Sequence, residues 1–125
     1  MKKRRNEAVL PPAYEGIERQ LMAVHYCGVY LTNADMVEVG KKMGLELGLK
    51  ERMSLLKVLM HEAHESGKKG EMIQGFIEIL QKRAQAYQEQ AQQFPEAADL
   101  LQSMIQKARS TAMLLQREMR SDPYA

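Results

Sequence analysis

Residues 73–119 read IQGFIEILQKRAQAYQEQAQQFPEAADLLQSMIQKARSTAMLLQREM, and apolar side chains recur in them at alternating steps of four and three. We call these positions the apolar ladder: Ile73, Ile77, Leu80, Ala84, Tyr87, Ala91, Phe94, Ala98, Leu101, Ile105, Ala108, Ala112, Leu115 and Met119. None of these side chains is charged. A mean spacing of about 3.5 residues keeps one stripe of a helix facing a partner helix. The segment therefore predicts long helices that pack through this stripe.

Pro95 interrupts the apolar ladder near its middle. Proline lacks a backbone N–H and is tolerated in the first turn of a helix, but it disrupts the interior of one. We predict that the chain reverses here, so that residues 71–93 and 95–120 form a long antiparallel helix pair. In such a pair Leu80 and Ile105 lie about equally far from the turn and should approach each other. A single helix kinked at Pro95 is the alternative, which the unbroken phase of the ladder supports.

Three shorter helices are predicted before this pair. The first covers about residues 13–31 and is apolar on nearly all sides near its end, so we expect it at the centre of the core. The second covers about residues 34–48 and contains three glycines, of which Gly48 is expected to end it. The third covers about residues 50–66. The predicted fold class is all-α, with about five helices in a single bundle.

The composition indicates one globular domain. The chain has 125 residues, of which 45% are hydrophobic and 27% charged. We assign residues 13–121 to the bundle, residues 1–12 to a disordered basic arm and residues 122–125 to a tail. The net charge of +2 is less than the positive charge of the arm alone. The rest of the chain is therefore mildly acidic, without the basic stripe that nucleic-acid binders usually carry.

The cysteine content and hydropathy favour the cytoplasm. Cys27 is the only cysteine, so no disulfide can form within the chain, as is usual in a reducing compartment. No apolar segment reaches the roughly 18 residues of a membrane-spanning helix. The basic N-terminus is not followed by the apolar core of a signal peptide. We expect a cytoplasmic protein that does not enter a membrane.

One cluster has side chains of the metal-ligating kind, namely His61, His64 and Glu65. Residues three or four apart meet on a helix surface. Zinc hydrolases, however, place the second histidine one residue later, and a metal site needs three or four protein ligands. Metal binding is therefore the third of our functional predictions. No nucleophile motif, phosphate-binding loop or paired-carboxylate pattern is present, so we expect neither an enzyme nor a cofactor.

A small DNA-binding regulator is the second prediction. In residues 34–58, Gly40 and Gly44 fall at the small-residue and turn positions of a helix-turn-helix, but Lys50 falls where that motif buries a side chain. The basic arm could bind phosphate groups. The candidate nucleic-acid contacts are Lys2, Lys3, Arg4, Arg5, Lys50 and Arg52.

The leading prediction is a non-enzymatic helical interaction module, an adaptor or small chaperone that binds an unidentified protein. Two features favour it: an excess of apolar helix surface for a chain of this size, and the lack of a reactive motif. The same excess predicts a homodimer. The predicted interface residues are Met22, Tyr26, Tyr30, Leu80, Ile105 and Leu115.

Overall fold

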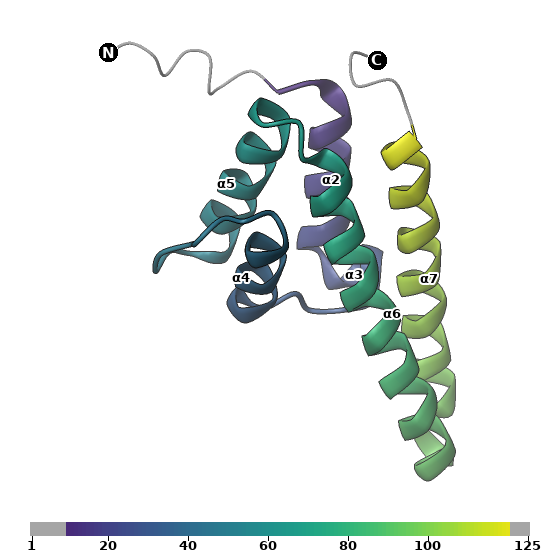
Figure 1. The fold of residues 1–125 in the computed structure, drawn as a ribbon. Helices are drawn as coiled ribbons and strands as arrows, with labels where there is room; N and C mark the ends of the chain where they lie inside the picture. The colour runs from purple at the N-terminus through teal and green to yellow at the C-terminus, as the bar shows by residue number, and fades with distance from the viewer. Residues whose placement is uncertain (1–9, 121–125) are drawn as a thin grey trace.

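The computed structural model describes residues 10–120 (Figure 1). Its elements are α2 (Pro12–Met22), α3 (Val24–Cys27), α4 (Asn33–Lys42), α5 (Arg52–Glu65), α6 (Lys69–Gln93), the 3-10 turn η1 (Pro95–Ala97) and α7 (Ala98–Arg120). No strand occurs between residues 10 and 120. The predicted all-α bundle with a long C-terminal helix pair is confirmed. Predictions about the basic residues of the arm and about the tail lie outside the described residues.

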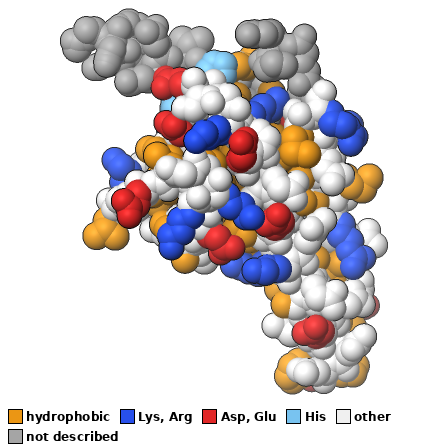
Figure 2. Space-filling view, viewed as in Figure 1, with side chains coloured by type: hydrophobic (Ala, Val, Ile, Leu, Met, Phe, Trp, Pro, Cys, Tyr) orange, Lys and Arg blue, Asp and Glu red, His pale blue; other side chains and the backbone are white. Residues whose placement is uncertain are grey.

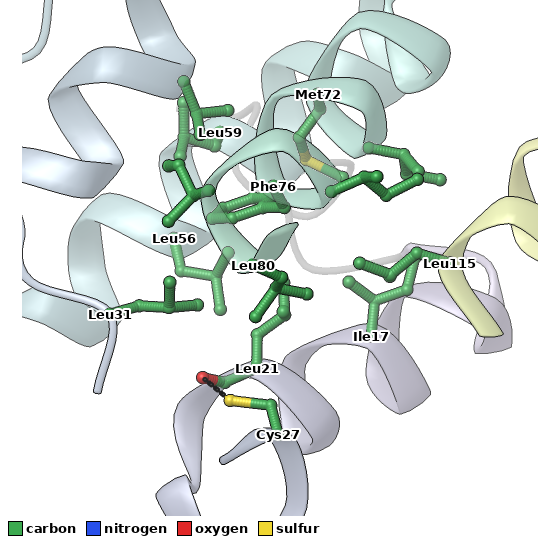
Figure 3. Close-up of a cluster of buried hydrophobic side chains, with 14 of the residues drawn as sticks. Ile17, Leu21, Cys27, Leu31, Leu56, Leu59, Met72, Phe76, Leu80 and Leu115 are labelled. Carbon is green, nitrogen blue, oxygen red and sulfur yellow. Dashed lines mark hydrogen bonds between the residues drawn. The ribbon is translucent and has the colours of Figure 1, made fainter. Parts of the chain in front are cut away.

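The bundle is organised around α6. This helix packs against α7 and also against α4 and α5 (Figure 1). Its buried residues Met72, Phe76 and Leu80 join Leu56 of α5 and Leu21 of α2 in one apolar cluster (Figure 3). Because α6 contributes to contacts on several sides, it is the central element of the fold.

The segment expected to form one helix over about residues 13–31 forms two. The chain leaves the helical conformation at Ala23 (φ −112°, ψ 118°), and α3 ends after one turn at Gly28 (φ 77°). The single-helix prediction is wrong because the backbone is extended at Ala23, and because Gly28 then adopts the left-handed conformation that ends helices. The expected place at the centre of the core is also wrong, since α2 buries one face only, through Tyr14, Ile17 and Leu21.

The second predicted helix is also shorter than expected, because α4 ends at Lys42 and not at Gly48. Gly44 has a positive φ of 76°, and the Leu45 N–H donates to the Gly40 carbonyl (2.8 Å), which folds the chain back on the helix. An added Cβ at Gly40 would lie 3.2 Å from Leu47 Cγ. Gly40 and Gly44 therefore allow the chain after α4 to turn back and lie close against the end of this helix. Residues 43–51 form an irregular connection to α5.

The start of α4 is held by a capping box and an ion pair. The Asp35 N–H donates to Thr32 Oγ1 (3.1 Å), and the Thr32 N–H donates to Asp35 Oδ2 (2.8 Å). Arg83 of α6 donates from Nη2 to both carboxylate oxygens of Asp35, at 2.7 and 2.9 Å. Asp35 is buried, and these bonds satisfy its charge. The pair therefore links the N-terminus of α4 to the central helix.

Helices α6 and α7 run antiparallel, as predicted from Pro95 (Figure 1). The Phe94 N–H makes the last bond of α6, to the Gln90 carbonyl (2.8 Å), and the Ala97 N–H donates to the Phe94 carbonyl (2.9 Å) within the turn. One continuous kinked helix is excluded by this reversal. The buried positions of the apolar ladder are Ile73, Ile77, Leu80, Ala84, Ala91, Leu101, Ile105, Ala108, Ala112 and Leu115.

The register of this pair brings Leu80 near Ala108 and Ala112. Leu80 lines a shallow groove together with Ala108 and Ala112. Near the other end of the pair, an added Cβ at Gly70 would lie 4.0 Å from Met119 Cγ. Both observations agree with a register in which Leu80 lies near Ala108, one turn beyond Ile105. Symmetry about Pro95 favours this register, because Leu80 lies fifteen residues before Pro95 and Ile105 only ten residues after it.

Candidate functional site

The candidate metal ligands His61, His64 and Glu65 lie near the end of α5. The His64 ring packs edge-on against Tyr14, with ring centres 5.8 Å apart. Among residues 10–120, no group of three or more His, Cys, Asp or Glu side chains could hold a metal ion. Within the described residues, these three side chains therefore do not form a group that could hold a metal ion.

The candidate nucleic-acid residues are not brought together within the described residues. Lys2, Lys3, Arg4 and Arg5 lie in the part of the chain that is not described. Lys50 is exposed in the connection between α4 and α5. This connection, residues 43–51, is longer than the roughly three or four residues of a helix-turn-helix turn. Helices α4 and α5 therefore do not form that motif, although DNA binding by the arm stays a prediction.

Arg52 has a structural role. Its Nη1 donates to the Leu31 carbonyl (2.6 Å) and its Nη2 to the Met22 carbonyl (3.0 Å). The guanidinium carbon also lies 4.1 Å from the centre of the Tyr30 ring. Because the half-buried guanidinium already has two carbonyl partners and an aromatic partner, its contacts are within the fold. The prediction that Arg52 contacts nucleic acid is therefore not supported by its position.

The six predicted interface residues differ in exposure: three are buried, one is half-buried and two are exposed. Leu80, Ile105 and Leu115 are at most 1% exposed, so they belong to the core of the single chain and a partner cannot reach them. Their apolar character reflects packing of α6, α7 and α2. Met22 is half-buried against the core. Tyr26 and Tyr30 are 47% and 55% exposed and remain on the surface.

Cys27 is not a reactive thiol. It is fully buried, and its Sγ donates to the Val29 carbonyl (3.1 Å). Burial raises the pKa of the Cys27 thiol above its ordinary value. Because the thiolate is the nucleophile, a thiol that stays protonated near neutral pH does not provide nucleophilic chemistry.

The most distinctive surface is the far end of the α6–α7 pair. The two helices extend well beyond the other helices there (Figure 1). We call residues 86–104 the hairpin tip. Phe94 and Leu100 are 53% and 67% exposed on it, and apolar side chains appear at the lower end of the space-filling view (Figure 2). The hairpin tip therefore presents apolar side chains away from the body of the bundle.

The charged residues of the hairpin tip are all acidic. They are Glu89, Glu96 and Asp99, and the segment contains no lysine or arginine. All three are exposed. Glu96 and Asp99 lie in the first turns of η1 and α7, where a carboxylate also complements the helix dipole. The apolar side chains of the tip thus lie within a negatively charged surface.

The sequence pattern does not predict this site. Phe94 belongs to the apolar ladder and is therefore predicted to face a partner helix, whereas Leu100 lies off the ladder, beside Leu101. Two features of the sequence bear on the site: an apolar residue outside the ladder, and the absence of basic residues from positions 86–104. Neither signal shows which residues project beyond the core, since that depends on how far the other helices extend.

A second surface is the groove between α2 and α7, which has a volume of about 530 Å³. We call it the α2–α7 groove. Ile17 and Leu115 point toward one another at its base (Figure 3). Ala13, Gly16 and Leu114 also line the groove. Its lining residues on α7 are Leu114, Leu115 and Glu118, which lie in the C-terminal part of that helix, whereas the hairpin tip contains its N-terminal part.

No protein-family model matches this chain, and comparisons with curated proteins and with solved structures likewise find no match. Between residues 10 and 120, no helix has the length and hydropathy needed to cross a membrane. The fold thus defines an all-α bundle with a projecting helical hairpin. Its function has to be argued from the two surfaces themselves.

Proposed function

We propose that this protein is a non-enzymatic interaction module, an adaptor or small chaperone of the cytoplasm. Its hairpin tip would bind a partner surface that is both basic and apolar. The observation that carries the proposal is the exposure of Phe94 and Leu100 on a projecting segment that has no lysine or arginine. A projecting pair of helices can enter a concave partner surface that the body of the bundle could not approach.

The apolar side chains of the hairpin tip supply affinity. Burying a Phe or Leu side chain contributes about 1.5–3 kcal/mol relative to leaving it exposed. Phe94 and Leu100 lie at the turn and in the first turn of α7, so one partner surface can cover both. Aromatic anchors at the centre of an interface commonly dominate its binding energy. We therefore expect Phe94 to contribute more than Leu100.

The acidic side chains of the hairpin tip supply selectivity. Glu89, Glu96 and Asp99 attract a cationic surface and repel an anionic one, and such charges act mainly on the rate of association. Because all three are exposed, added salt screens their effect. The same charges oppose nucleic acid as a ligand of the tip.

A defined probe tests this proposal. The probe is a synthetic, fluorescently labelled amphipathic helix with leucine on one face and lysine on the other. Anisotropy titrations with the full chain should show saturable binding that weakens as salt is added. The double variant F94A/L100A should bind at least about tenfold more weakly, a change of ~1.4 kcal/mol in binding free energy.

Two controls show whether binding depends on the hairpin tip and on the charge of the probe. Met113→Ala removes a side chain that is 65% exposed on α7 outside the hairpin tip, and it should bind the probe as the wild type does. A second peptide with glutamate in place of lysine keeps the apolar face and should bind far less. Equal binding of both peptides, or unchanged binding by F94A/L100A, would show that the tip is not the binding element.

A further inference from the structure

The side of α7 that meets α3 becomes uncovered toward the hairpin tip (Figure 1). Four residues share this side at steps of four and three, namely Leu100, Met104, Lys107 and Thr111. An added Cβ at Gly28 would lie 2.3 Å from the Met104 carbonyl oxygen and 3.1 Å from Lys107 Cβ, so the end of α3 covers α7 at these two residues. Thr111 is fully buried, whereas Leu100 is 67% exposed. We call the uncovered angle between α3 and α7, at Leu100, Met104 and Lys107, the α3 step.

The charges of the hairpin are segregated by sign along the chain. Between residues 86 and 99 every charged residue is acidic. Between residues 100 and 117 every charged residue is basic, namely Lys107, Arg109 and Arg117. Two α7 helices that run antiparallel can therefore set the acidic part of each copy against the basic part of the other. The α3 step lies in the basic part, so it is complementary to a hairpin tip.

Asp99 and Lys107 define the register of such a pair. They line the same shallow depression on α7, and Ser103 lies midway between them. At ~1.5 Å per residue they are about 12 Å apart along the helix, too far for an ion pair within one chain. Neither makes an ion pair with any other described residue. A two-fold axis beside Ser103 sets Asp99 of each copy opposite Lys107 of the other, so this contact forms twice.

We infer that the hairpin tip of a second copy packs in the α3 step, in a two-fold dimer of antiparallel α7 helices. The same symmetry sets Leu100 of each copy beside α3 of the other, which covers the apolar side chain that its own α3 leaves exposed. The short side chain of Ser103 allows the helices to approach at the axis. This inference rests on the proposed function, because it identifies a basic and apolar surface that the tip binds. Self-association would then compete with other partners for the tip.

Sedimentation equilibrium of the full chain at micromolar concentrations tests the inference. We expect a concentration-dependent mass between 14.3 kDa and twice that value, because a two-fold interface closes at the dimer. Asp99→Lys and Lys107→Glu should each raise the dissociation constant at least about tenfold, since each variant turns both charge contacts repulsive. An equimolar mixture of the two variants should dimerise as the wild type does, because both contacts of the mixed dimer again join opposite charges. Circular dichroism and thermal unfolding verify the fold of each variant.

Arg109→Glu is the matched control, because it makes the same charge change as Lys107→Glu on the same helix. Arg109 lies outside the α3 step and lines the groove that contains Leu80. It should change the dissociation constant far less than Lys107→Glu does. A mass of 14.3 kDa at every concentration overturns the inference. So does a mixture of Asp99→Lys and Lys107→Glu that stays monomeric, or a dimer that Arg109→Glu weakens equally.

The lysine-bearing amphipathic probe separates this inference from the proposed function. Lys107→Glu leaves Phe94 and Leu100 in place, so the monomeric variant should bind the probe. A monomeric wild type that binds the probe would overturn the dimer and retain the function of the tip. A monomeric wild type that does not bind it would overturn both.

Discussion

Gly28 shows how one residue can determine the path of the chain. Its φ of 77° ends α3, and its Cα faces α7 so closely that an added Cβ would lie 2.3 Å from the Met104 carbonyl oxygen. A non-glycine residue would therefore meet two separate difficulties, an unfavourable backbone conformation and a clash with the main chain of another helix.

Gly28→Ala should lower the free energy of unfolding by more than the ~1–3 kcal/mol that backbone strain alone costs. Gly67→Ala is the matched control, because Gly67 has a similar φ of 67° but nothing within 4 Å of its added Cβ. Urea unfolding of both variants measures the difference. Equal losses in the two variants would show that the approach of α3 to α7 contributes nothing.

Cys27 should make stability depend on alkaline pH. Burial raises the pKa of its thiol, so the thiol ionises more readily in the unfolded chain than in the folded one. Stability from this residue is complete below the unfolded pKa of about 8.5 and is lost as the pH rises toward the folded pKa. Between about pH 7 and pH 9.5, the wild type should lose more stability than Cys27→Ala in urea unfolding. Parallel losses would contradict the prediction.

At the scale of elements, the interior of the α6–α7 pair depends on matched side-chain sizes. Leu80 and Ala108 are both fully buried, and the register places a large residue opposite a small one. A large residue opposite a small one allows two helices to approach closely.

A size exchange tests this register. Leu80→Ala should cost about 2–5 kcal/mol through the cavity that it leaves, and Ala108→Leu should cost about 1–3 kcal/mol through overpacking. In L80A/A108L the new leucine can occupy the vacated space, so the combined loss should be smaller than the added single losses. Chemical unfolding of the four proteins measures the coupling. Additive losses would show that the two residues do not face each other.

Arg52 links α5 to the end of α2 through the Met22 carbonyl and to the segment before α4 through the Leu31 carbonyl. Arg52→Lys keeps the charge but not the fork of donors, so we expect a loss of about 1–2 kcal/mol in the free energy of unfolding. Arg109→Lys, at an exposed position of α7, is the control and should change it by less than about 0.5 kcal/mol. A similar small change in both variants would show that the fork at Arg52 does not stabilise the fold.

For the whole molecule, the hairpin tip should contribute little to folding. Deleting residues 86–92 together with residues 97–103 removes two turns from each helix and keeps the phase of the remaining ladder. We expect the shortened chain to unfold in one cooperative transition. Its loss of stability should not exceed the ~3–5 kcal/mol expected for Phe76→Ala in the core. Loss of cooperative unfolding in the shortened chain would instead show that the bundle needs the tip in order to fold cooperatively.

Much of this architecture follows from the sequence by itself. The spacing of the apolar ladder predicts two long helices, and Pro95 predicts their reversal, because helix periodicity and the missing proline N–H act locally. The sequence predicts the roles of individual polar residues less well than it predicts the helices. Arg52 has the residue type of a nucleic-acid contact, but its carbonyl partners at Met22 and Leu31 come from distant parts of the chain.

Only the tertiary structure decided where the helices end and which apolar residues stay exposed. Gly28 ends a helix against the backbone of α7, and Gly44 turns the chain back over Gly40, so both ends depend on contacts between elements. Phe94 follows the same period as the buried ladder positions yet is 53% exposed. Periodicity sets the face on which a side chain lies, whereas burial also requires a neighbouring element to cover that face, and α6 and α7 extend beyond the helices that could do so.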